Sequence, residues 1–172
     1  RESMRFEISA IQKKMHITVI YVTHDQSEAM AMSDRVVVMS AGVVQQIGHP
    51  HDIYSNPVNK MVADFIGLVN FVKGSVQGDR VFIEGTEVSF PNTNGVSGDN
   101  VTVAVRPENI TISKTAGALA GVVRHSFFLG DSTDFRIECG KHMFRVIVKG
   151  VDATAFPDGT NVFLDFSKVM LF

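Results

Sequence analysis

The pattern of hydrophobic residues changes once along the chain, between Gly67 and Asn70. Before this point, apolar residues recur at helical spacing or gather in short continuous runs. After it, short alternating runs are separated by glycine, aspartate and asparagine, a pattern typical of β-hairpins. We therefore predict two domains, residues 1–67 with helices and strands together, and residues 68–172 built from strands.

The first half of residues 1–67 has the pattern of an α/β layer. Apolar residues at helical spacing predict an amphipathic helix over residues 2–14. The run Ile17–Thr23 is almost wholly β-branched or aromatic, which is typical of a strand covered on both faces in a parallel sheet. A short helix through Met32 should follow, with Asp25 or Ser27 capping its first N–H groups.

The second half of this segment predicts a hairpin and two short helices. The β-rich runs 35–39 and 43–47 are separated by Ser40-Ala41-Gly42, where glycine supplies unusual backbone angles. Helices are predicted over Pro50–Tyr54 and Asn59–Ile66, because Asn56-Pro57 and Gly67 stop them.

Residues 68–172 contain many short strands and no helices to cover them. Such strands must close up to protect their edges, so a small barrel of the oligonucleotide/oligosaccharide-binding (OB) type is the leading architecture. The clearest hairpin runs from Asp134 to Val148 and turns at Gly140-Lys141. The predicted fold class is α+β overall, an incomplete α/β segment followed by an all-β, OB-like domain.

Composition narrows the classes of partner and compartment. The net charge is -2 and the basic residues are scattered, which argues against nucleic acid as a partner. Cys139 is the only cysteine, so no internal disulfide can form, and a cytoplasmic location is expected. The apolar runs are too short to cross a bilayer. Because helical periodicity starts at Arg1 without a methionine, we interpret the start as a cut inside a larger protein.

Two neighbouring segments carry a specific family resemblance. Tyr21–Met30, read as YVTHDQSEAM, and the following Ser33–Met39 closely resemble the switch-histidine region of ABC-transporter ATPases. The resemblance continues through Gln46-Ile47-Gly48 and Val62–Gly67, in the manner of the importers for sugars, polyamines and ferric iron.

Later segments resemble the transport-associated (TOBE) domain that follows the ATPase domain in this subfamily. These are Val105-Arg106-Pro107-Glu108 and Phe128-Leu129-Gly130-Asp131. The resemblance implies that residues 1–67 are the C-terminal remnant of an ABC ATPase domain and residues 68–172 a regulatory OB-like β-barrel. It is specific for the family and much less specific for the transported solute.

The resemblance also implies an activity for the complete protein. We expect an ATP-binding subunit that uses ATP and Mg²⁺, forms a homodimer, and drives solute uptake through membrane permease subunits with a solute-binding protein. It would lie on the cytoplasmic face of the membrane, held there by the permease subunits. Barrel pairing, or the binding of a small inhibitory ligand or a protein, is a second, non-catalytic function for the chain itself.

His24 is the candidate catalytic residue. It follows the predicted strand, and open α/β sheets bind ligands beyond the carboxyl ends of their strands. By resemblance it is the switch histidine that contacts the γ-phosphate of ATP and helps to hold the attacking water. An imidazole suits this role because it both donates and accepts hydrogen bonds at neutral pH. The alternative is a histidine that merely caps the following helix.

Most of the machinery for phosphoryl transfer is missing from this sequence. No segment matches G-x-x-x-x-G-K followed by serine or threonine, and Gly140-Lys141 is followed by His142. By resemblance, the signature segment and the catalytic glutamate would precede Arg1. We therefore expect that this chain alone neither holds ATP tightly nor hydrolyses it.

Other candidate sites favour structural interpretations. His49-Pro50-His51-Asp52 is a weak metal pattern and more often a polar helix entry, so no metal is assigned. Arg106-Pro107-Glu108 should set a turn and an ion pair. The following phenylalanines could stack nucleic-acid bases, but core packing is favoured: Phe127, Phe128, Phe135 and Phe144.

Overall fold

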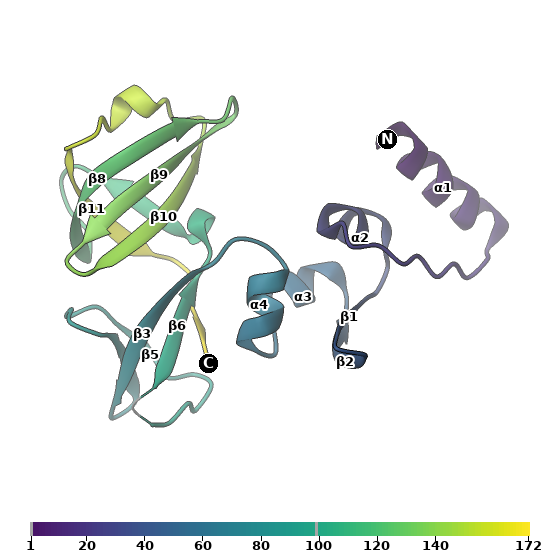
Figure 1. Cartoon of the computed structure of the whole chain (residues 1–172), viewed down its shortest axis with the longest axis horizontal. Coiled ribbons are helices and arrows are strands. Elements are labelled where there is room, and N and C mark those ends of the chain that lie inside the picture. The colour runs from purple at the N-terminus through teal and green to yellow at the C-terminus, as the bar shows by residue number, and fades with distance from the viewer. Residues whose placement is uncertain (1, 99) are drawn as a thin grey trace. The chain divides into compact units, whose positions relative to one another are not determined.

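The computed structural model describes residues 2–98 and 100–172, apart from the side chains of residues 2–6 and 9 (Figure 1). It divides into two compact units, Arg1–Gly67 and Leu68–Phe172. The first unit contains the helices and one hairpin, in the order α1 (Glu2–Met15), α2 (Gln26–Met32), β1 (Val36–Ser40), β2 (Val43–Gly48), α3 (Pro50–Ser55) and α4 (Lys60–Phe65).

The predicted hairpin and short helices of the first unit are confirmed. Strands β1 and β2 pair antiparallel, and Ala41 and Gly42 in their turn have φ angles of 49° and 78°. Positive φ at both turn residues matches the right-handed twist of the flanking strands, so the turn sets the register. Helix α3 begins with Pro50 in its first turn, and α4 is capped by Asn59, whose side chain accepts from the Val62 N–H.

The predicted strand at Ile17–Thr23 is wrong. These residues form no helix or strand, and no described strand pairs with them. The side chains of Ile20 and Val22 are 89% and 91% exposed. A strand exists only through backbone bonds to its neighbours, and no such neighbour is among the described residues. The expected α/β layer is therefore not shown, and the first unit is a small helical structure with one hairpin.

A small apolar core supports the hairpin and helices of the first unit. Alternate residues of β1, Val36 and Val38, are buried, and they belong to one cluster with Ile53 of α3 and Val62 of α4. Ile66, just after α4, closes the same cluster. This core brings α3 and the end of α4 to a position beside α2.

The second unit is all β, as predicted, and its strands form two half-barrel sheets, an OB-like arrangement. The sheet orders are β10-β9-β8-β11-β7 and β12-β6-β3-β4-β5, and every strand pair is antiparallel. The strands are β3 (Asn70–Gln77), β4 (Arg80–Ile83), β5 (Ser89–Pro91), β6 (Val101–Val105), β7 (Ile110–Ser113), β8 (Leu119–Phe128), β9 (Ser132–Cys139), β10 (His142–Lys149), β11 (Asn161–Phe166) and β12 (Met170–Leu171).

One continuous hydrophobic core lies within the second unit. The predicted hairpin is confirmed as β9 and β10, and it places Phe135 and Phe144 in this core without exposure. The Phe144 ring lies 5.5 Å from that of Phe166 on β11. The core prediction is wrong for Phe127 and Phe128, which are 52% and 61% exposed at the end of β8. Strand alternation alone does not reveal that β8 extends beyond its neighbour β11.

Buried polar groups link the strands around this core. Asp134 is buried and accepts from Arg136 and Arg145, with N–O distances of 2.7 Å and 2.6 Å. Arg106 is also buried and donates to the carbonyl oxygen of Leu68 at 3.3 Å. The turn predicted at Arg106-Pro107-Glu108 is present, because the Asn109 N–H donates to the Arg106 carbonyl oxygen.

Cys139 allows a prediction about pH. Burial raises the pKa of its thiol from an ordinary value of 9.0 to about 11, and the Glu138 carboxylate adds to the rise. The folded state therefore holds the thiol proton more tightly than the unfolded state does. Its contribution to stability is complete below pH 9 and is lost as the pH rises towards 11. We expect a Cys139→Ala variant to lose this part of the pH dependence in urea unfolding, and the same slope in both proteins would contradict this assignment.

Candidate functional site

His24 lies at a bend between the extended residues 17–23 and helix α2, and its side chain is exposed. The predicted position at the end of a paired strand is not shown, because the preceding residues are unpaired. The bend leads directly into α2 at Gln26. The imidazole therefore lies on the surface, next to a helix start.

A compact hydrogen-bond network fixes the backbone on both sides of His24. The Thr23 hydroxyl accepts from the Asp25 N–H and donates to the Glu28 carboxylate, both at 2.9 Å. The Tyr21 hydroxyl donates to the same carboxylate at 3.0 Å. The Asp25 carboxylate accepts from the Glu28 N–H at 3.1 Å, so Asp25 is the N-cap of α2.

This network excludes one interpretation of His24, that of a helix cap. Because Asp25 caps α2, the alternative that His24 does so is wrong. Of the two capping residues predicted, Asp25 is confirmed and Ser27 lies inside the helix. The network uses Thr23, Asp25 and Glu28 and leaves the imidazole of His24 out of its bonds. The exposed ring thus lies beside a backbone that is hydrogen-bonded on both sides.

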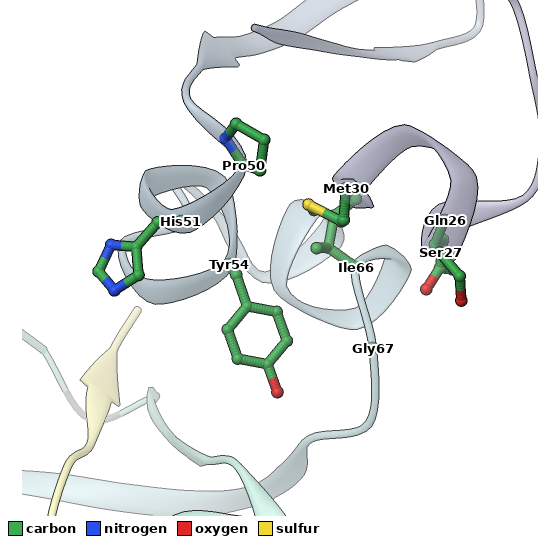
Figure 2. Close-up of a pocket in the computed structure, with 8 residues that line it drawn as sticks. All are labelled: Gln26, Ser27, Met30, Pro50, His51, Tyr54, Ile66 and Gly67. Carbon is green, nitrogen blue, oxygen red and sulfur yellow. The ribbon is translucent and has the colours of Figure 1, made fainter. Parts of the chain in front are cut away.

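An open cavity of about 440 Å³ lies beside this bend (Figure 2). Its apolar part comes from Met30 and Ile66, which Figure 2 shows close together between α2 and the end of α4. Its full lining is Gln26, Ser27, Met30, Pro50, His51, Tyr54, Ile66 and Gly67. None of these residues is lysine or arginine, so the cavity lacks the cations that commonly bind a triphosphate.

The histidines near α3 have structural contacts. His49 Nδ1 lies 2.8 Å from the carbonyl oxygen of Asp34, which connects the residue before α3 to the segment just before β1. His51 is on the surface, with Nδ1 3.8 Å from the Asp52 carboxylate. Among the described residues, no group of three histidine, cysteine, aspartate or glutamate side chains could hold a metal ion.

Two features of this region are missed by reading the sequence. The hydrogen bonds that Glu28 accepts from Tyr21 and Thr23 are only partly indicated by the sequence, in which Asp25 and Glu28 have the spacing of a capping box. The cavity has no local signal, because it forms from α2, α3 and the residues after α4. Only the packing of those elements creates it.

Comparisons with known proteins show what the second unit and the chain as a whole are similar to. Residues 103–171 match the TOBE domain family. A relative in Ruegeria pomeroyi, named spermidine/putrescine import ATP-binding protein PotA, is 42% identical over 144 residues, which is 80% of this chain and 39% of the relative. A Clostridium acetobutylicum protein of the same name is 44% identical over 140 residues, 80% of this chain and 40% of that protein.

A third relative is named for the import of a different solute. The Fe(3+) ions import ATP-binding protein FbpC of Fusobacterium nucleatum is 39% identical over 171 residues, which is 95% of this chain and 46% of the relative. Among solved structures, the cytoplasmic molybdate-binding protein ModG is similar with a TM-score of 0.42 and 10% identity, over 60% of this chain and 94% of that one. That score is too low to support an argument.

The chain spans less than half the length of these relatives, between 39% and 46%. The matches nevertheless cover 80% to 95% of the chain itself, and the match to the Fusobacterium protein is long enough to include the residues around His24. Over most of its length the chain is therefore similar to one part of proteins named import ATP-binding proteins, and its second unit contains a match to the TOBE domain.

Proposed function

We propose that the complete protein is the ATP-binding subunit of an ABC importer. Its dimer would close on ATP and Mg²⁺ and drive solute inward through membrane permease subunits. The observation that carries this proposal is the segment Tyr21–Met39, whose switch-histidine motif lies in a chain related to proteins named import ATP-binding proteins. Residues 1–67 would be the end of the ATPase domain, and residues 68–172 a regulatory domain.

His24 would contact the γ-phosphate and orient the attacking water. Three features support this role: the imidazole is exposed, the backbone around it is fixed by Thr23 and Asp25, and neither residue uses the ring. A neutral imidazole donates from one nitrogen and accepts at the other, so it can bond a phosphate oxygen and a water together. The remaining groups that hold ATP and Mg²⁺ would come from residues outside this sequence.

The proposed location is the cytoplasmic face of the membrane, where permease subunits would hold the protein. No described helix is long and apolar enough to cross a membrane. A solute-binding protein would deliver the cargo. Polyamines and ferric iron are the candidate solutes, because the relatives include proteins named for the import of spermidine and putrescine and of Fe(3+) ions.

A titration of this chain with Mg-ATP separates the enzymatic role from a regulatory role of the chain alone. We expect no measurable affinity in calorimetry, because the sequence contains no phosphate loop, whereas the complete subunit should bind. Binding by the chain would contradict this expectation.

Light scattering tests the second candidate, a non-catalytic dimerising module. A strictly monomeric chain at high concentration would exclude dimerisation.

A further inference from the structure

On the side away from β9, the end of strand β8 has no paired strand among the described residues, although the loop before β11 lies beside it. Strand β9 pairs with β8 as far as Phe128, but β11 pairs only with residues 119–122. The loop before β11 extends this pairing by one residue, since Val123 bonds to Gly159 and Thr160. In the part of the chain that the structure describes, residues 124–128 have backbone ladder partners on the β9 side alone. An edge of this kind can accept another strand.

The side chains at this edge are unusually apolar for a protein surface. Phe127, Phe128 and the adjoining Leu129 are three consecutive residues that are each more than half exposed. The Phe127 ring lies 6.3 Å from the ring of His125, so the outer side of the edge carries two aromatic groups. The turn after β8 and the start of β9 lie at one end of their sheet (Figure 1). Exposed apolar residues beside an unpaired edge are typical of an interaction surface.

One carboxylate, that of Asp158, lies at this edge. The Asp158 carboxylate accepts from the Ser126 hydroxyl at 3.4 Å and lies 3.8 Å from His125 Nδ1, so it reaches across the unpaired residues. The nearest arginine on β9, Arg136, is bonded to the buried Asp134. Arg124 forms two bonds with Glu138. An incoming strand would therefore meet an exposed carboxylate on the edge that it has to approach.

We propose that residues 124–128 of β8 bind an extended segment of another protein that carries lysine or arginine between apolar residues. The segment adds a strand to the sheet, with main-chain bonds along β8. Its apolar side chains pack on the face that carries Phe127, and its basic side chain pairs with Asp158. This surface belongs to the second unit and needs neither ATP nor His24, so it goes beyond the proposed ATPase function.

The test is a nuclear magnetic resonance titration of the full chain with a short synthetic peptide of alternating lysine and valine. We expect binding, with amide shifts confined to residues 124–128 and to the loop around Asp158. A matched peptide of alternating glutamate and valine should bind at least about tenfold more weakly, because it places several like charges near Asp158.

Variants of the chain assign the contacts. Asp158→Asn should weaken binding of the lysine peptide roughly threefold to fivefold, which is the size of one exposed ion pair. Phe127→Ser should weaken it about tenfold through lost apolar contact. Met143→Ser is the matched control, since Met143 is 52% exposed on β10, the opposite edge strand, and this variant should bind normally.

Four results would overturn the proposal: no binding at millimolar peptide, equal binding of the two peptides, shifts centred on β10, or normal affinity in both edge variants. Shifts of residues 124–128 when the chain alone is concentrated would instead assign the edge to a second copy. None of these measurements uses nucleotide. A negative result would therefore contradict the proposed binding at β8 without affecting the ATPase proposal.

Discussion

Replacement of His24 by alanine in the complete subunit is expected to lower ATP turnover at least about a hundredfold, while Mg-ATP still binds. A hundredfold decrease in turnover corresponds to the loss of one group that positions water and stabilises charge in the transition state. Binding is spared because most contacts to ATP would come from residues outside this sequence. The backbone around the site should also persist, since Thr23, Asp25 and Glu28 hold it without the imidazole.

Steady-state turnover and equilibrium ATP binding measured on the same preparations check this expectation. His142→Ala is a suitable control, because His142 belongs to the second unit, does not line the cavity beside His24, and has its Nε2 2.8 Å from the Glu84 carbonyl oxygen. It should leave turnover unchanged. If His24→Ala also turns over ATP at the normal rate, the switch role is wrong.

Replacement of Phe144 by alanine is expected to cost the second unit about 3 to 5 kcal/mol of unfolding free energy. Phe144 is fully buried, and its ring lies 5.5 Å from that of Phe166. Removing it takes away burial and leaves a cavity between β10 and β11 that rigid strands fill poorly. Urea unfolding, followed by a signal from the second unit, measures the loss.

The adjacent residue provides the control for this stability prediction. Met143 precedes Phe144 on β10 but points to the other side of the strand and is 52% exposed. Met143→Ala should change the unfolding free energy by no more than about 0.5 kcal/mol. A loss below about 1 kcal/mol for Phe144→Ala would mean that the two sheets do not share a tightly packed core.

Local signals explain what the sequence predicts correctly. The turn at Ala41-Gly42 and the Asn59 cap of α4 depend on residues within a few positions of one another. The same is true of the β9–β10 hairpin, where Gly140 has a φ angle of 58°. Each of these features follows from backbone geometry and short-range periodicity.

Features that depend on distant partners are not predictable in this way. Ile17–Thr23 has strand-like composition, yet composition cannot supply the neighbouring strands that a paired strand requires. The sheet order β10-β9-β8-β11-β7 joins strands far apart in the sequence. Phe127 and Phe135 have similar alternating surroundings, but only Phe135 lies where both sheets cover it.

The candidate site also combines features that local sequence predicts with features that depend on distant contacts. His24 stands out from the sequence because of its family motif, and Asp25 because it precedes a helix. The cavity beside them requires α2, α3 and Ile66 to pack together, which no local pattern specifies. The unpaired side of β8 near Asp158 likewise exists only because β11 ends its pairing at Val122, and because Asp158 reaches Ser126 from a distant loop.

A structure of the complete subunit with Mg-ATP tests the central claim most directly. The account predicts that an imidazole nitrogen of His24 lies about 3 Å from an oxygen of the γ-phosphate across a closed dimer. An imidazole turned into an apolar interior, away from the nucleotide, would contradict it.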